Sequence, residues 1–127
     1  MEAVTYLDTH VVVWLYAGLS DRFPASVRKR LESPLAVSPV VELELQYLYE
    51  VGRTTVPGDA VISELEQLVG LEKVDASLAA VASVARGLIW TRDPFDRLIS
   101  AQAIADEVRL LTADGTILEN LDLAAWE

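Results

Sequence analysis

Residues Val4-Thr5-Tyr6-Leu7-Asp8 form the most informative segment of the chain, because an apolar run ends directly in a carboxylate. β-Branched and aromatic residues favour a buried strand, so Asp8 would lie just beyond its carboxyl end. A second segment, Val108-Arg109-Leu110-Leu111-Thr112-Ala113, repeats the arrangement and is followed by Asp114. In open α/β sheets, functional sites form beyond the carboxyl ends of the strands. The two acids are therefore expected at one edge of a sheet.

Short strand-like runs alternate with helical patterns along the rest of the chain. Strands are expected at 3–7, 35–37, 72–74 and 108–112, with a possible edge strand at 121–126. Helices are expected at 9–17, 23–32, 38–52, 57–69, 77–88 and 93–107, with a short turn or helix at 115–120. This alternation predicts an α/β fold with a mostly parallel sheet covered by helices.

The composition is that of a globular chain. With 127 residues, 52% of them hydrophobic, a single domain spanning 1–127 is expected. The absence of cysteine excludes disulfides and thiolate metal sites. The acidic start at Met1-Glu2 is unlike a signal peptide. No apolar run reaches the roughly 18 residues of a membrane span, so no membrane contact and a cytoplasmic location are expected.

The net charge of -10, from 20 acidic and 10 basic residues, limits the possible partners. It argues against a protein that holds nucleic acid by bulk electrostatics. A nuclease is still possible, because bound cations would offset part of the charge at its site. The same charge makes a basic partner protein plausible.

Glu44 interrupts an apolar stripe of the helix expected at 38–52, and this stripe is expected to face the core. The residues three and four positions away are all apolar or aromatic: Val40, Val41, Tyr47 and Leu48, with Val51 one turn further on. Buried glutamates are rare unless they are paired or bound to a metal. The alternative for Glu44 is an ion pair with an arginine such as Arg53. Glu42 lies on a more mixed face and is the weaker candidate.

The other acids have a structural alternative as helix caps. Asp8, Asp93 and Asp114 each precede an expected helix and fit the N-cap position. Taken singly, capping is the better interpretation of Asp8 and Asp114, and Asp93 fits a structural or supporting role. Asp96 would fall in the first turn of its helix, where a carboxylate suits the helix dipole. Its role stays open on physical grounds alone.

If the acids at 8, 44, 96 and 114 converge, their charges repel one another unless a cation lies among them. Hard divalent cations such as Mg²⁺ take oxygen ligands, which points to metal-assisted phosphate chemistry. Thr9 and Thr112 could hydrogen-bond these carboxylates, although surface or capping roles are about as plausible. Arg92 and Arg97 could contact phosphates. The single histidine, His10, is expected to pack on Trp14, and a zinc site is not expected.

Four blocks in this order resemble the PIN-domain family, and within it the VapC-type toxins of toxin–antitoxin modules. They are Tyr6-Leu7-Asp8-Thr9-His10-Val11-Val12-Val13-Trp14, Ser38-Pro39-Val40-Val41-Glu42-Leu43-Glu44 with Gly52-Arg53, Arg92-Asp93-Pro94-Phe95-Asp96-Arg97-Leu98-Ile99-Ser100-Ala101-Gln102-Ala103, and Leu111-Thr112-Ala113-Asp114. The resemblance covers nearly the whole length. The chain departs from the family at Val41, where related toxins often carry a hydroxyl residue, and in its acidity.

The resemblance implies a three-layer α/β/α fold and endoribonuclease activity that depends on Mg²⁺ or Mn²⁺. It implies Asp8, Glu44, Asp96 and Asp114 as catalytic and metal-binding residues. It also implies a homodimer that acts on RNA and is inhibited by a small VapB-like antitoxin. Thr9, Asp93, Arg97 and Thr112 are expected to support the acids or to position the substrate.

Three other functions share features with this sequence. A receiver domain needs two acids near the end of the first strand, and Glu2 and Asp8 are poorly placed for that. A haloacid-dehalogenase-type phosphatase needs Asp-x-Asp after the first strand, where this chain has His10. A catalytically silent PIN module that acts only by binding would share the fold, and only an activity assay separates it from a nuclease.

Overall fold

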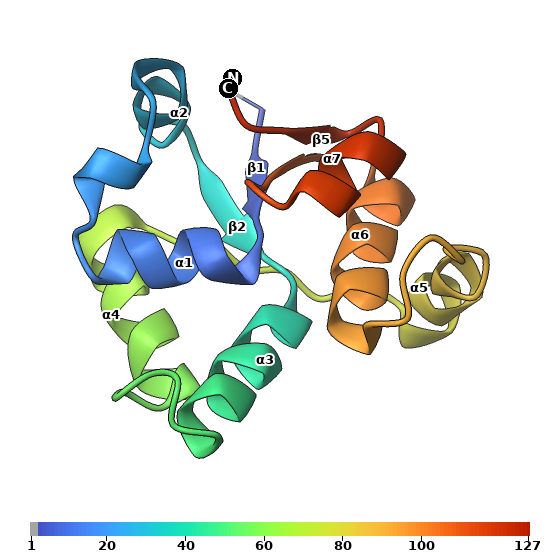
Figure 1. Ribbon diagram of the computed structural model, residues 1–127, viewed down its shortest axis with the longest axis horizontal. Coiled ribbons are helices and arrows are strands. Elements are labelled where there is room, and N and C mark those ends of the chain that lie inside the picture. Colours follow the sequence, from blue (N-terminus) through green and yellow to red (C-terminus); the bar gives the residue numbers. More distant parts are fainter. Residues whose placement is uncertain (1–2) are drawn as a thin grey trace.

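A five-stranded parallel sheet forms the centre of the protein in the computed structural model (Figure 1), which describes residues 3–127. Met1 and Glu2, on which the predictions about a signal peptide and a receiver domain partly rest, lie outside the described residues. The strands are β1 (Thr5–Leu7), β2 (Leu35–Val37), β3 (Glu72–Lys73), β4 (Arg109–Leu111) and β5 (Ala124–Ala125), in the order β3-β2-β1-β4-β5. Each observed pair is parallel, which confirms the expected sheet.

The helices lie where the sequence patterns predict them, with shifts of a few residues at the ends. They are α1 (Thr9–Tyr16), α2 (Ala25–Arg30), α3 (Pro39–Glu50), α4 (Gly58–Val69), α5 (Leu78–Ala85), α6 (Pro94–Asp106) and α7 (Gly115–Asn120). A short 3₁₀ helix, η1 (Ser20–Arg22), was not predicted. No helix within the described residues combines the length and hydropathy needed to cross a membrane.

Helices cover both faces of the sheet, which confirms the three-layer α/β/α arrangement (Figure 1). In Figure 1, α1, α2 and α4 lie on one side, and α6 and α7 lie on the other with α5 packed outside α6. Helix α3 contacts α1, α4 and α6. It therefore lies beside the carboxyl end of β1, where α1 begins.

Strands β1 and β2 are buried along their whole length, as expected for a parallel sheet covered on both faces. One large cluster of buried apolar side chains joins β1, β2 and β4 to α1, α3 and α6. Gly58 at the start of α4 permits close packing against α3, because a Cβ atom there would lie 2.5 Å from the Glu42 carbonyl oxygen. This contact helps to hold α3 in place beside the sheet edge.

The strand register aligns the first and fourth strands at their carboxyl ends. Leu7 pairs with Leu111, so the next residues along the two strands, Asp8 and Thr112, come side by side. The backbone N–H of Asp8 donates to the Leu111 carbonyl oxygen at 3.0 Å. Both strand ends therefore deliver polar side chains to the same edge of the sheet.

Candidate functional site

Asp8 is a buried carboxylate that is 5% exposed and has hydrogen bonds to both of its oxygens. It is the N-cap of α1, and its Oδ1 accepts the Thr9 backbone N–H at 2.8 Å. Its Oδ2 accepts the Thr112 hydroxyl at 2.7 Å. Burial raises the pKa of this carboxyl despite these hydrogen bonds. Asp8 therefore caps α1, as expected. Its carboxylate is also buried, which disfavours its charged form.

Glu44 is also buried, at 8% exposed. The Thr9 hydroxyl donates a hydrogen bond to its Oε1. Burial raises the pKa of this carboxyl, and the charge of Asp8 adds to the effect. Within residues 3–127, the only ion pair closer than 4.0 Å joins Lys73 to Glu42. The alternative of an ion pair between Glu44 and an arginine is therefore wrong in this structure.

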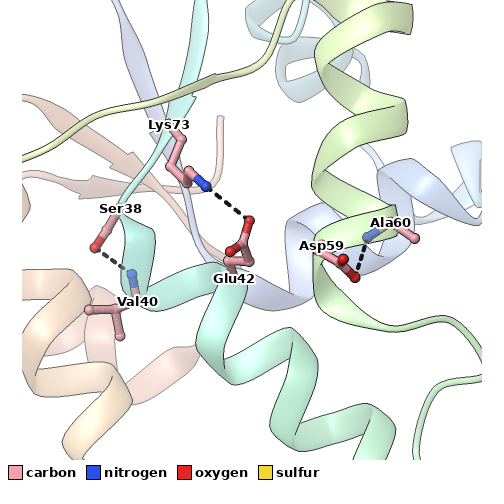
Figure 2. A network of polar contacts seen from close by, with 6 residues as sticks. All are labelled: Ser38, Val40, Glu42, Asp59, Ala60 and Lys73. Carbon is pink, nitrogen blue, oxygen red and sulfur yellow. Dashed lines mark hydrogen bonds and ion pairs between the residues drawn. The ribbon is translucent and has the colours of Figure 1, made fainter.

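The Glu42 side chain points toward Lys73 of β3, as Figure 2 shows. Its carboxylate lies 3.1 Å from the Lys73 ammonium, and both side chains are partly exposed. The helical phase thus separates the two acids as predicted. The prediction for two neighbours of Glu44 was wrong, however, because Tyr47 and Val51 are 49% and 52% exposed. Glu44 lies at the margin of the core.

Asp96 lies in the first turn of α6, where the Asp93 carboxylate accepts its backbone N–H at 3.0 Å. Burial raises the pKa of the Asp96 carboxyl from its ordinary value near 3.8 to about 7, and neighbouring carboxylates add to the rise. In decreasing order of effect these neighbours are Asp93, Asp8, Asp114 and Glu44. The four acids singled out in the sequence, together with Asp93, therefore interact electrostatically at one edge of the sheet.

Asp114 is exposed and caps α7. Its Oδ1 accepts the Ile117 backbone N–H at 3.0 Å. Its own backbone N–H donates to the Thr112 hydroxyl oxygen at 3.1 Å. The Thr112 hydroxyl therefore connects the Asp8 carboxylate to the backbone of Asp114. Thr9 connects Asp8 to Glu44 in a different way, since its backbone N–H donates to Asp8 and its hydroxyl donates to Glu44.

Arg97 and Arg92 have partners on the backbone rather than on these carboxylates. Arg97 Nε donates to the Thr91 carbonyl oxygen, and Arg92 Nη1 donates to the Ile89 carbonyl oxygen, both at 2.8 Å. These bonds shape the loop that precedes α6. A contact of Arg97 with phosphate stays a prediction.

The donor set suits a hard divalent cation, because it consists of carboxylate oxygens. In the part of the chain that the structure describes, no three acidic or histidine side chains are gathered closely enough to hold one ion. A shared ion would therefore require these side chains to turn toward one another. Burial, with smaller contributions from neighbouring carboxylates, raises the pKa of Asp8, Glu44 and Asp96, and a bound cation would favour their charged forms.

A small cavity of about 180 Å³ adjoins this edge and is lined by Asp8, His10, Trp14, Ala113 and Asp114. Sequence reasoning treated His10 only as a packing partner of Trp14. The signal that could have found it is its position two residues after Asp8, on the first turn of the same helix. A larger hollow of about 510 Å³, lined in part by Lys29, Arg30 and Arg109, lies at the opposite, amino ends of β1 and β4.

Comparison with known structures shows that the fold is shared with toxin–antitoxin complexes. The chain is 19% identical to a chain of VapBC2 from Rickettsia felis bound to promoter DNA, with a TM-score of 0.69 over 98% of this chain and 97% of that one. It is 17% identical to a chain of DNA-bound VapBC from Salmonella typhimurium, with a TM-score of 0.64 over 99% of this chain and 98% of that one. It is 16% identical to a chain of a toxin–antitoxin complex from Klebsiella pneumoniae, with a TM-score of 0.65 over 98% of this chain and 96% of that one.

Comparison with curated proteins gave no significant match. Among protein families, the one described as PIN domain matches residues 5–122, which includes all four blocks recognised in the sequence. The match runs from the first strand to beyond α7. It therefore contains the whole carboxylate edge, and the chain belongs to the PIN domain family.

Proposed function

We propose that this chain is a divalent-metal-dependent endoribonuclease and the toxin of a VapC-type toxin–antitoxin pair. The observation that carries the proposal is the burial of Asp8 and Glu44, which are linked through Thr9, near Asp96, whose pKa is raised to about 7 by burial and by the neighbouring carboxylates. Buried carboxylates that repel one another are unfavourable alone and favourable around a cation. The family membership and the fold shared with VapBC complexes support the same function.

In this proposal Asp8, Glu44, Asp96 and Asp114 hold one or two Mg²⁺ or Mn²⁺ ions. When bound, the cation would act as a Lewis acid toward the phosphate and would lower the pKa of water. Thr9 and Thr112 keep Glu44 and Asp8 oriented through their hydroxyl hydrogen bonds. The carboxylates orient the attacking water for displacement at phosphorus. No side chain is required as a covalent nucleophile.

Chelation of divalent ions is expected to stop cleavage. Purified protein should cut single-stranded RNA in the presence of Mg²⁺ or Mn²⁺ and lose this activity in excess EDTA, because carboxylates alone neither polarise a phosphate nor acidify water. Restoring the ion should restore cleavage, which separates chelation from denaturation. The measurement is the rate of cleavage of a labelled RNA oligonucleotide. Undiminished cleavage in EDTA would contradict the metal mechanism.

A small antitoxin is the proposed partner, and a cationic segment of it is expected to reach the carboxylate edge. A guanidinium group pairs bidentately with carboxylates, and the net charge of -10 favours fast encounter with a basic chain. A homodimer is proposed as well. Leu43 and Tyr47, one turn apart on α3, are 62% and 49% exposed and offer apolar surface for a second copy.

Expression of this chain alone is expected to slow bacterial growth, because cleavage of RNA in the cytoplasm would block protein synthesis. Co-expression of the proposed small antitoxin, which we expect to be encoded by the neighbouring gene, should restore growth. An Asp8→Asn variant should be harmless at equal expression, since asparagine keeps the N-cap of α1 but removes the charge. Growth curves with immunoblots provide the measurement. A well-expressed, harmless wild-type chain that does not cleave RNA would refute the toxin proposal.

A catalytically silent PIN module is the second candidate function. Two observations favour it: Asp8, Asp93 and Asp114 all serve as helix caps, and no three acids within residues 3–127 form a ready metal cluster. The same cleavage assay separates the two functions. Binding of a partner without cleavage, in Mg²⁺ and in Mn²⁺, would support the silent module.

A further inference from the structure

The cavity beside the carboxylate edge combines two acids with two flat rings. Asp8 and Asp114 lie on one part of its lining, and His10 and Trp14 lie on another. Its volume is about 180 Å³, whereas pockets for drug-sized ligands span about 300–1,000 Å³. The cavity is therefore suited to one small planar group. Because Asp8 and Asp114 line the cavity, a bound group would lie next to the phosphate at which these acids are proposed to act.

His10 and Trp14 form an aromatic wall of the cavity, and further aromatic side chains pack against Trp14. They are four residues apart on α1 and so share one face of the helix, with ring centroids 6.4 Å apart. Trp14 packs against Phe23 and Trp126, with ring centroids 6.4 and 5.9 Å away. The His10 ring is exposed. An exposed ring thus rests on an aromatic cluster that is anchored in the core.

A cation adjoins the same wall. The Arg22 guanidinium carbon lies 5.0 Å from the centroid of the Trp14 ring. Arg22 is exposed, and no carboxylate of the described residues lies within ion-pairing distance of it. Proteins that bind single strands combine aromatic rings that stack on bases with cations that contact the backbone. Both elements occur here, because His10 and Trp14 line the cavity and Arg22 lies over the Trp14 ring.

We propose that this cavity is a nucleobase subsite, in which a base next to the scissile phosphate stacks on His10 beside Trp14 and Arg22 contacts a neighbouring phosphate. The inference rests on the proposed RNA cleavage and extends it by locating the part of the chain that holds the substrate. It also accounts for RNA binding by a chain with a net charge of -10, because base stacking needs no excess of positive charge.

A purely electrostatic role is the competing explanation of His10. Burial raises the pKa of both Asp8 and Glu44, and the charge of His10 opposes this rise. Replacement by phenylalanine separates the two roles, because it keeps an exposed ring and removes the charge. Replacement by alanine removes both. The two variants therefore give different results under the two explanations.

The test uses RNA oligonucleotides with one cleavable bond and each of the four bases beside it. His10→Ala is expected to raise KM by about 5- to 100-fold, the equivalent of one lost stacked base, and to flatten the base preference. The kcat should change little, because the lost contact is made equally in the ground and transition states. His10→Phe should restore the wild-type KM. Arg22→Gln should raise KM at low salt and less at high salt.

The outcomes distinguish this inference from the function on which it rests. Tyr49→Ala removes an exposed aromatic side chain of α3 outside the cavity, and it should leave KM unchanged. If the wild type cleaves RNA but His10→Ala keeps its KM and base preference, the subsite is refuted and the nuclease stands. If His10→Phe behaves like His10→Ala, stacking is refuted. If the wild type cleaves no member of the panel with Mg²⁺ or Mn²⁺, the proposed function fails, and the subsite with it.

Discussion

Replacing Glu44 with glutamine is expected to lower RNA cleavage by at least about 100-fold, while Glu42→Gln changes it little. Glutamine keeps the shape of Glu44 and can still accept the hydrogen bond from Thr9, so only the charge is lost. Loss of a group that merely supports a metal ligand costs about 10- to 100-fold in affinity or activity. Loss of a direct ligand should therefore reach or exceed the upper end of that range. Cleavage rates and Mn²⁺ titration calorimetry measure the two effects.

Glu42→Gln is the matched control because Glu42 lies on the same helix, two residues earlier, with its carboxylate at the surface. Its ion pair with Lys73 is partly exposed, and such pairs contribute about 0–1 kcal/mol. Folding and metal binding should therefore persist in this variant. If Glu42→Gln abolished cleavage and Glu44→Gln did not, the assignment of the metal-binding glutamate would be wrong.

Asp96→Asn is expected to abolish cleavage and, without metal, to raise the melting temperature. The unfolded carboxyl has a pKa near 3.9, and the folded one has a pKa raised to about 7. Between these values the native state retains a proton that the unfolded state has lost, so stability falls as pH rises through this window. The loss of folding stability caused by ionising this carboxyl is complete above pH 7 and absent below about pH 4. Asparagine does not ionise, so the variant does not lose this stability.

The measurement is the melting temperature in EDTA at pH 5 and pH 8, where the gain from Asp96→Asn should be larger at pH 8. About 1 kcal/mol shifts the melting temperature of a small domain by roughly 2–8 °C. The stability lost on ionising Asp96 is therefore detectable even after solvent screening has reduced it. Asp59→Asn, at an exposed acid in the first turn of α4, is the control for the substitution itself and should not raise the melting temperature. A lower melting temperature for Asp96→Asn at both pH values would indicate that Asp96 stabilises its helix.

The strand ends were the part of the site that local sequence could predict. An apolar run followed by a carboxylate placed Asp8 and Asp114 beyond β1 and β4, because strand propensity and burial depend mainly on neighbouring residues. The α/β class followed from the alternation of elements. The register could not be predicted, and it is the pairing of Leu7 with Leu111 that brings Thr112 within reach of Asp8.

Helical periodicity predicted the burial of Glu44 but not where the core ends. Tyr47 is one turn from Glu44 and was expected to be buried, yet it is half-exposed and packs on Phe95 with ring centroids 5.7 Å apart. Periodicity identifies a face of a helix, whereas the neighbouring helices determine how far along that face the contact extends. For the same reason the cavity at His10 required a structure, since its lining comes from α1 and from the segment that follows β4.

The capping bonds of Asp8 and Asp114 have an evolutionary consequence. Asparagine caps a helix about as well as aspartate, so a single base change in either codon would remove a charge that we propose for metal binding and leave the fold intact. If the chain is a toxin as proposed, such a copy would still present the surface that the proposed antitoxin recognises. Where several such gene pairs occur together, copies inactivated in this way would compete for antitoxin and alter the dose at which the intact copies act.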